Sequence, residues 1–167
     1  MRWFDREFAF AFEVSIYPSV LERMRGLLPR VRELIRCYPG ATWGARAGDA
    51  WSPQEHLGHM GDLEELWVGR IDDFLAGHER LRPADLENRM THSAGHNERS
   101  LEAVVEDLAA KRAAHVGRLE ELTIADFGRI AKHPRLEQSM RLVDSVYFVA
   151  EHDDHHLAAA RQLLRNQ

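Results

Sequence analysis

Apolar residues recur at steps of three and four along four stretches of the chain, which is the period of one face of an α-helix. The clearest stretch begins at Ser52, a predicted N-cap that Pro53 follows at the first helical position and Glu55 completes as a capping box. The pattern predicts a helix from Ser52 to a stop at Gly77. Its apolar positions are Leu57, Met60, Leu63, Leu66, Trp67, Ile71 and Phe74.

Two more long helices are predicted from the same period. The first begins at Pro18, is broken or kinked between Gly26 and Pro29, and ends at Pro39-Gly40. The other begins with Ser100 as its cap. Its apolar positions are Leu101, Val104, Val105, Leu108, Val116, Leu119 and Leu122.

A fourth helix is predicted from about Gln138 to Leu164, after His133-Pro134 breaks the chain. Residues 80–95 are polar and irregular, which is typical of a connection. Strand alternation with turn signals occurs nowhere along the sequence. Four long helices joined by loops predict an all-α fold, a four-helix bundle.

Residues 1–17 form an apolar lead-in that is rich in aromatic residues, among them Phe8, Phe10 and Phe12. The chain has no internal repeat, no low-complexity tract and no linker long enough to divide it. We therefore expect residues 1–167 to form a single domain. The lead-in is more apolar than a bundle of this size requires, and exposed apolar patches usually mark interfaces, so a homodimer is expected.

The charge distribution excludes several classes of function. The 27 acidic and 22 basic residues give a formal net charge of -5, and the two signs are mixed along the chain, which favours neither nucleic acid nor an anionic membrane as a partner. No apolar stretch approaches the roughly 20 residues that span a bilayer. The first residues carry acids and lack the pattern of a secretion signal.

Cys37 is the only cysteine, so no disulfide can form within the chain, and a reducing, cytoplasmic location is expected.

Histidine is the residue type whose positions suggest a metal-binding site. Five of the ten histidines fall in two short segments, one in the second helix and one in the last. His59 shares the spacing of Leu63 and Leu66 and is expected on the buried face, while His152 and His156 lie one turn apart on one face of the last helix. Three neutral imidazoles from two helices could bind one divalent metal ion and leave a coordination position open for water or substrate. Imidazole suits zinc, nickel, copper or iron, so the ligands do not select the ion.

Other interpretations of these residues stay open. A His-x-x-x-His pair can simply face solvent, and an inward His59 can be a hydrogen-bonded core residue. His56, His92, His96 or His155 could replace one of the three chosen ligands. Asp62 and Asp144 could orient imidazole N–H groups, although surface charge is the more frequent role of such residues. Three histidines are expected at the surface or as caps: His78, His115 and His133. Four aromatic residues are expected in the core: Trp51, Trp67, Tyr147 and Phe148.

Three segments of the chain resemble the DinB/YfiT-like superfamily. The first is Trp51-Ser52-Pro53-Gln54-Glu55-His56-Leu57-Gly58-His59, followed by Asp62-Leu63-Glu64 and Trp67, and the second is Asn97-Glu98-Arg99-Ser100. The third comprises His133-Pro134-Arg135-Leu136, Met140-Arg141, Asp144 and Phe148-Val149-Ala150-Glu151-His152-Asp153-Asp154-His155-His156-Leu157. The similarity covers residues 18–164, and the combination of motifs is more specific than any one of them.

This resemblance implies a four-helix bundle of the DinB/YfiT-like type, commonly dimeric, with a metal ion bound by three histidines. Those positions correspond here to His59, His152 and His156. Characterised relatives include transferases that use bacillithiol, mycothiol or glutathione and a mycothiol-dependent isomerase, and many others are described as metal-dependent hydrolases. We therefore expect a metal-dependent thiol S-transferase or hydrolase, with zinc or nickel as the favoured ion and a low-molecular-weight thiol as a possible cosubstrate. The alternatives are a non-enzymatic protein that binds metal or a small ligand in a stress response, and a helical association domain with incidental histidines.

Overall fold

The predicted capping signals begin two of the long helices. The Ser52 hydroxyl accepts a hydrogen bond from the Glu55 backbone N–H (3.1 Å), and the Glu55 carboxylate accepts one from the Ser52 N–H (2.8 Å). Helix α3 (Pro53–Asp62) therefore starts with two of its free amides satisfied. Ser100 caps α6 (Leu101–Glu120) by accepting from the Ala103 N–H (3.1 Å).

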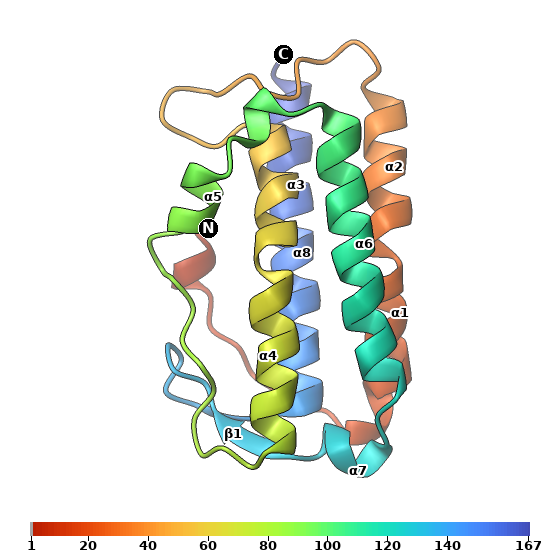
Figure 1. Ribbon diagram of the computed structural model, residues 1–167, viewed down its shortest axis with the longest axis vertical. Coiled ribbons are helices and arrows are strands. Elements are labelled where there is room, and N and C mark those ends of the chain that lie inside the picture. The colour runs from red at the N-terminus through yellow and green to blue at the C-terminus, as the bar shows by residue number, and fades with distance from the viewer. Residues whose placement is uncertain (1) are drawn as a thin grey trace.

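The computed structural model describes residues 2–167 and confirms the four-helix bundle (Figure 1). Each of the first two long helices is divided in two. Gly26 separates α1 (Tyr17–Arg25) from α2 (Leu27–Cys37), as the sequence predicts, and Leu63 separates α3 from α4 (Glu64–Leu75). At Gly77 φ is +73°, a left-handed conformation that favours glycine and stops α4. The last helix is α8 (Leu142–Arg165).

The order of the helices around the bundle differs from a simple up-and-down arrangement. Helix α1 packs on α6 and α8, and α3 and α4 pack on the same two partners, so the first two long helices lie at opposite corners. The connection from α4 to α6 makes this possible because it runs back along the outside of the bundle (Figure 1). It carries α5 (Arg89–Ser93) and the 3-10 turn η3 (His96–Glu98).

The structure corrects two predictions about the segment before the last helix. β1 (Ile130–Lys132) pairs antiparallel with β2 (Ser139–Arg141), although no strand was expected. Helix α8 consequently begins at Leu142 and not near Gln138, and the Asp144 carboxylate accepts the Arg141 N–H at its first turn (2.7 Å). Three-residue strands are too short to show alternation, so periodicity could not reveal them. A short helix, α7 (Ile124–Phe127), also precedes the hairpin.

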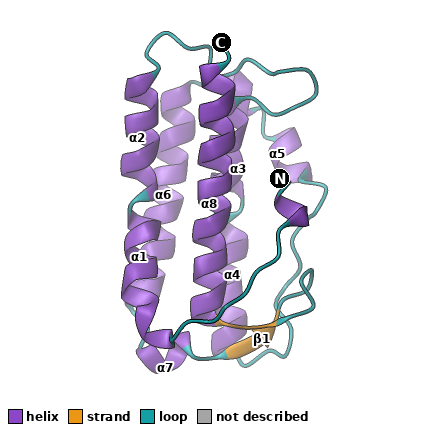
Figure 2. Ribbon diagram, turned by 180° about the vertical axis from the view of Figure 1, so that it is seen from behind, coloured by secondary structure: helices purple, strands orange, loops and turns teal. Residues whose placement is uncertain are grey.

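The aromatic lead-in packs on α8 of its own chain. Its initial residue, Met1, lies outside the described residues; the described part crosses α8 as an extended segment between the 3-10 turns η1 (Trp3–Asp5) and η2 (Val14–Ile16) (Figure 2). The rings of Trp3 and Phe8 have centroids 5.0 and 4.9 Å from that of Phe148. Much of the apolar surface that suggested a homodimer is therefore used within the chain, and Phe8, Phe10 and Phe12 remain only partly buried.

Within residues 2–167, no helix combines the length and the apolar character that a bilayer crossing requires.

Candidate metal centre

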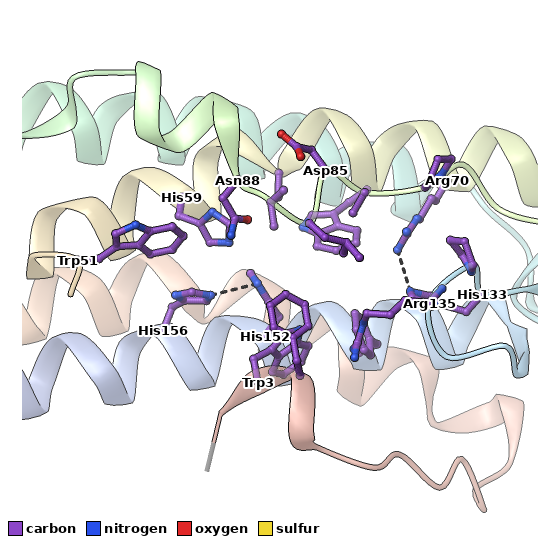
Figure 3. A pocket seen from close by; sticks show the side chains of 18 residues that line it. Trp3, Trp51, His59, Arg70, Asp85, Asn88, His133, Arg135, His152 and His156 are labelled. Atoms are coloured by element: carbon purple, nitrogen blue, oxygen red, sulfur yellow. Dashed lines mark hydrogen bonds between the residues drawn. The ribbon is translucent and has the colours of Figure 1, made fainter. Parts of the chain in front are cut away.

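The three predicted histidines converge between α3 and α8. His59 comes from α3, and His152 and His156 come from successive turns of α8. One ring nitrogen of each lies within 4.8 Å of the other two, and the three side chains are buried (Figure 3). The Nε2 atoms of His152 and His156 are 3.1 Å apart. Two ligands of a tetrahedral zinc ion with bonds of 2.0–2.1 Å are separated by about 3.3 Å, so this pair has the spacing of metal ligands.

A hydrogen-bond chain fixes the orientation and the tautomer of His59. The Thr91 hydroxyl donates to Asp62 Oδ2 (2.7 Å) and lies 2.9 Å from His59 Nδ1. Because the hydroxyl proton is directed at the carboxylate, the oxygen must accept the proton of His59 Nδ1–H. The lone pair of His59 is therefore on Nε2, the nitrogen that remains for a metal ion. Asp62 also accepts from His96 Nε2 (2.9 Å).

The two histidines of α8 are held in different ways. Nδ1 of His156 lies 2.8 Å from Nδ1 of His56, which fixes the plane of its ring and leaves Nε2 directed at His152. The ring of His152 is in edge-to-face contact with Trp3, whose centroid is 5.0 Å away. His152 Nδ1 is buried and has no hydrogen-bond partner among residues 2–167, so packing and not a second hydrogen bond holds this ring.

Burial keeps the imidazoles neutral. It lowers the pKa of His59 to about 4, against the opposing charge of Asp62, and the neighbouring histidines lower it further. Burial also lowers the pKa values of His152 and His156 well below their usual range, and the other histidines of the cluster add to this effect. Neutral imidazole has a lone pair, so these side chains are in the protonation state that binds a metal ion.

Without bound metal, the protein should lose stability as the pH falls from about 6.5 to 4. The pKa values of His56 and His59 are lowered to about 4, and that of His133 to about 3, each chiefly because of burial. In this range the unfolded chain takes up protons that the folded chain does not, so each fully buried histidine can remove about 1.4 kcal/mol per pH unit. Urea unfolding of chelator-treated protein between pH 7.5 and 4.5 measures this; a free energy of unfolding that is constant or rises on acidification would contradict it.

A cavity of about 200 Å³ begins at the three histidines and extends along α4 and α8. The middle of the cavity is apolar, with Leu63, Trp67 and Phe148 among the lining residues. The connection from α4 to α6, here called the crossover connection, and the aromatic lead-in close its sides. Figure 3 shows Arg70, His133 and Arg135 at the end opposite the histidines. Such an apolar pocket with a few convergent polar groups is typical of a small-molecule site.

The other candidate ligands lie around the cluster in supporting positions. His56 contacts His156 and His96 contacts Asp62, so both belong to hydrogen-bond networks next to the cluster. The His92 ring packs against Trp51, and the His155 ring packs against Trp3. None of these four is in the group of three converging nitrogens. Asp62 accepts hydrogen bonds from His96 and from Thr91, which in turn contacts His59, whereas Asp144 caps α8 and contacts none of the clustered imidazoles.

Several expectations about single residues were wrong. His115 and His133 are buried, not at the surface: Nδ1 of His115 bonds the Glu64 carboxylate (2.7 Å), and His133 sits inside the hairpin loop beside Arg70. The Glu64 carboxylate on another helix satisfies His115, and the backbone N–H groups of Arg135 and Leu136 satisfy His133 Nδ1. Partners of this kind depend on the folded chain and were not visible in the helical periodicity. Trp51 was expected in the core but lines the cavity, with its ring centroid 4.6 Å from that of His59. His78 is exposed, as predicted.

Sequence reasoning missed Thr91, Arg70 and Arg135. Thr91 lies in the segment that appeared irregular, and it reaches His59 only because the crossover connection returns along α3. Arg70 falls on the inward face of α4, three turns from His59. A charged residue among the apolar positions of a predicted helix was the signal in the sequence that could have revealed it.

The comparisons with known proteins agree with this architecture. The structure resembles YfiT from Bacillus subtilis, described as a probable metal-dependent hydrolase with an unusual four-helix bundle topology, with a TM-score of 0.80 and 15% sequence identity over 96% of this chain and 93% of that one. At this identity the likeness establishes the fold. A search of curated proteins finds no match. The sequence model of the DinB superfamily matches residues 22–160, and the chain therefore belongs to the DinB superfamily.

Proposed function

We propose that His59, His152 and His156 bind one divalent metal ion, zinc or nickel, and that the protein is a metal-dependent enzyme of the hydrolase or thiol S-transferase type. The observation that supports this most is the convergence of three buried, neutral imidazoles at the end of an apolar cavity. A divalent ion in such a site lowers the pKa of a bound water or thiol and so supplies a nucleophile at neutral pH. The description of YfiT as a probable metal-dependent hydrolase is consistent with this proposal.

The residues around the cluster would contribute orientation and exclusion of water. Thr91 and Asp62 direct His59 Nε2 toward the other two imidazoles, and His56 does the same for His156. Trp51 and Trp3 cover the two sides of the histidine cluster, which limits access of solvent to the reacting group. Cys37 is exposed on α2, away from the cavity, so a thiol nucleophile would come from a cosubstrate.

Turnover should require both the metal ion and the histidine cluster. We would assay bacillithiol, mycothiol, glutathione and water against a panel of electrophiles and esters, comparing wild type with His152→Ala. A chelator should abolish the reaction, and added divalent ion should restore it in the wild type only. Because thiolates react slowly without a catalyst, the comparison with the mutant decides the outcome. If no reaction exceeds the rate with His152→Ala, the enzyme hypothesis fails and a protein that only binds metal is favoured.

We also propose that the protein forms a homodimer, supported by the partly exposed Phe8, Phe10 and Phe12 along α8. Light scattering at micromolar concentration should give twice the chain mass of 19.2 kDa. Replacing Phe10 with serine should shift the mass toward the monomer, and a monomeric wild type would refute the proposal.

A further inference from the structure

Two guanidinium groups lie at the end of the cavity away from the histidines. Arg70 is only 2% exposed, and within residues 2–167 its contacts are with uncharged groups: Nε donates to the Arg82 carbonyl (3.1 Å), and Nη1 lies 3.1 Å from His133 Nε2. Arg135 lies over the rings of Phe4 and Phe148, and its Nη2 is buried with no hydrogen-bond partner among the described residues. A buried guanidinium group without a bound anion is costly, and neither the buried Arg70 nor the partly buried Arg135 has an anion bound to it among the described residues.

The carboxylates near Arg70 and Arg135 already form hydrogen bonds with other groups. Asp73, on the turn of α4 beyond Arg70, binds Arg82 through both oxygens (2.7 and 3.0 Å) and also accepts the Arg82 backbone N–H (2.8 Å). Asp85 lines the cavity, but its oxygens accept the backbone N–H groups of Glu87 and Arg89 (3.1 and 2.9 Å). In Figure 3 the Asp85 carboxylate points away from the other lining residues. Among residues 2–167, neither carboxylate forms a hydrogen bond or an ion pair with Arg70 or Arg135, although the charge of Asp73 acts on Arg70 from a distance.

His133 cannot replace a carboxylate as the partner of Arg70. Its Nδ1 accepts the backbone N–H groups of Arg135 and Leu136 (3.3 and 3.1 Å), and a neutral imidazole has one acceptor nitrogen. His133 therefore cannot accept at Nδ1 from these backbone groups and at Nε2 from Arg70 Nη1 at the same time, and in its neutral form it brings no negative charge to Arg70. Burial lowers the pKa of His133 to about 3, and the charges of Arg70 and Arg135 lower it further. Burial lowers the pKa of Arg70 to about 10, against the opposing charge of Asp73, and the charges of Arg135 and Arg82 lower it further.

The distance between the histidine end and the arginine end of the cavity sets the length of a ligand that contacts both. His59 and Arg70 are eleven positions apart, which is three turns and brings both onto one face, with a rise of about 16 Å. The arginine side chain reaches back toward the start of its helix and shortens this span. Between the two ends the wall is formed by Leu63, Trp67 and Phe148, which favour an apolar group over a polar one.

We propose that Arg70 and Arg135 form an anion-binding subsite, and that the substrate is a small carboxylate whose apolar body lies between Trp67 and Phe148. The placement of its reacting bond at the three histidines rests on the proposed function; the anion subsite itself does not. Planar guanidinium groups match the geometry of a carboxylate, and a carboxylate would supply the acceptors that Arg70 and Arg135 lack.

The test compares 4-phenylbutanoate with its uncharged amide, each titrated by calorimetry and by chemical-shift changes into chelator-treated protein. The carboxylate should bind at least about tenfold more tightly than the amide, since a hydrogen bond to a charged group contributes about a factor of 10 to 100. Arg135→Gln and Arg70→Met should each remove this preference and leave the affinity for the amide unchanged. Arg129→Gln, which removes one exposed positive charge outside the cavity, should keep it.

Arg135 is only partly buried, so Arg135→Gln tests the subsite even if Arg70→Met does not fold. Equal affinities for carboxylate and amide, no binding of the carboxylate at millimolar concentration, or a preference that survives in Arg135→Gln would overturn the proposal. So would binding of the carboxylate that needs added metal and is lost in His152→Ala, because the carboxylate would then be a metal ligand. A preference that persists in metal-free protein supports the subsite even if no turnover is found.

Discussion

Replacing Arg112 with alanine should lower the free energy of unfolding by about 3–5 kcal/mol. Arg112 is 2% exposed in the centre of the bundle, where it donates to Asp153 (2.6 and 3.1 Å) and to Glu64 (2.5 Å). The side chains of both carboxylates are 1–2% exposed, so the substitution leaves two buried carboxyl groups without the guanidinium group that binds them. Urea unfolding at pH 7.5 measures the loss.

Lys111→Ala is the matched control for this experiment. Lys111 precedes Arg112 on α6 and also forms an ion pair, with Asp107 (2.8 Å), but its side chain is 44% exposed. Its removal should change the free energy of unfolding by less than about 1 kcal/mol. If Arg112→Ala is as stable as Lys111→Ala, the buried ion network does not hold the bundle together in the way its geometry indicates.

Removing any one of the three clustered histidines should weaken metal binding by more than about 100-fold. Loss of a residue that only orients a ligand typically costs about 10- to 100-fold, and loss of a ligand should cost more. Thr91→Val should fall in the smaller range, because it removes the acceptor for His59 Nδ1–H and leaves the three rings in place. His155→Ala and His78→Ala should bind metal like the wild type.

Competition with a chromophoric chelator measures these affinities. The graded order is the diagnostic result: wild type and the two control variants bind most tightly, Thr91→Val is intermediate, and the three ligand variants are weakest. A uniform loss across all variants would indicate that the substitutions destabilise the protein generally, and a strong loss in His155→Ala would place His155 in the coordination sphere.

The elements that carry a local signal were predictable from the sequence. The capping box at Ser52, the stop at Gly77 and the break at Gly26 act through neighbouring residues, so the bounds of α1 and α2, the start of α3 and the end of α4 follow from the sequence to within a few positions. The break at Leu63 between α3 and α4 was not predicted. The inward direction of His59, and of His152 and His156, follows from helical period in the same way, and the structure brings the three together.

The features that depend on the path of the chain in space were not predictable. The crossover connection decides that Thr91 meets His59, and the short hairpin decides that His133 and Arg135 close the far end of the cavity. His115 is buried because Glu64, on another helix, supplies its partner. In each of these cases the physical reason is a contact between residues far apart in sequence.

The number of metal ions per chain tests the central claim most directly. We would purify the untagged protein, reload it separately with zinc and with nickel, remove excess ion and measure metal content by elemental analysis beside His152→Ala. The three-histidine site predicts one ion per chain in the wild type, none in His152→Ala, and one in His155→Ala. A wild type that retains no ion, or a His152→Ala protein that still holds one per chain, would contradict it.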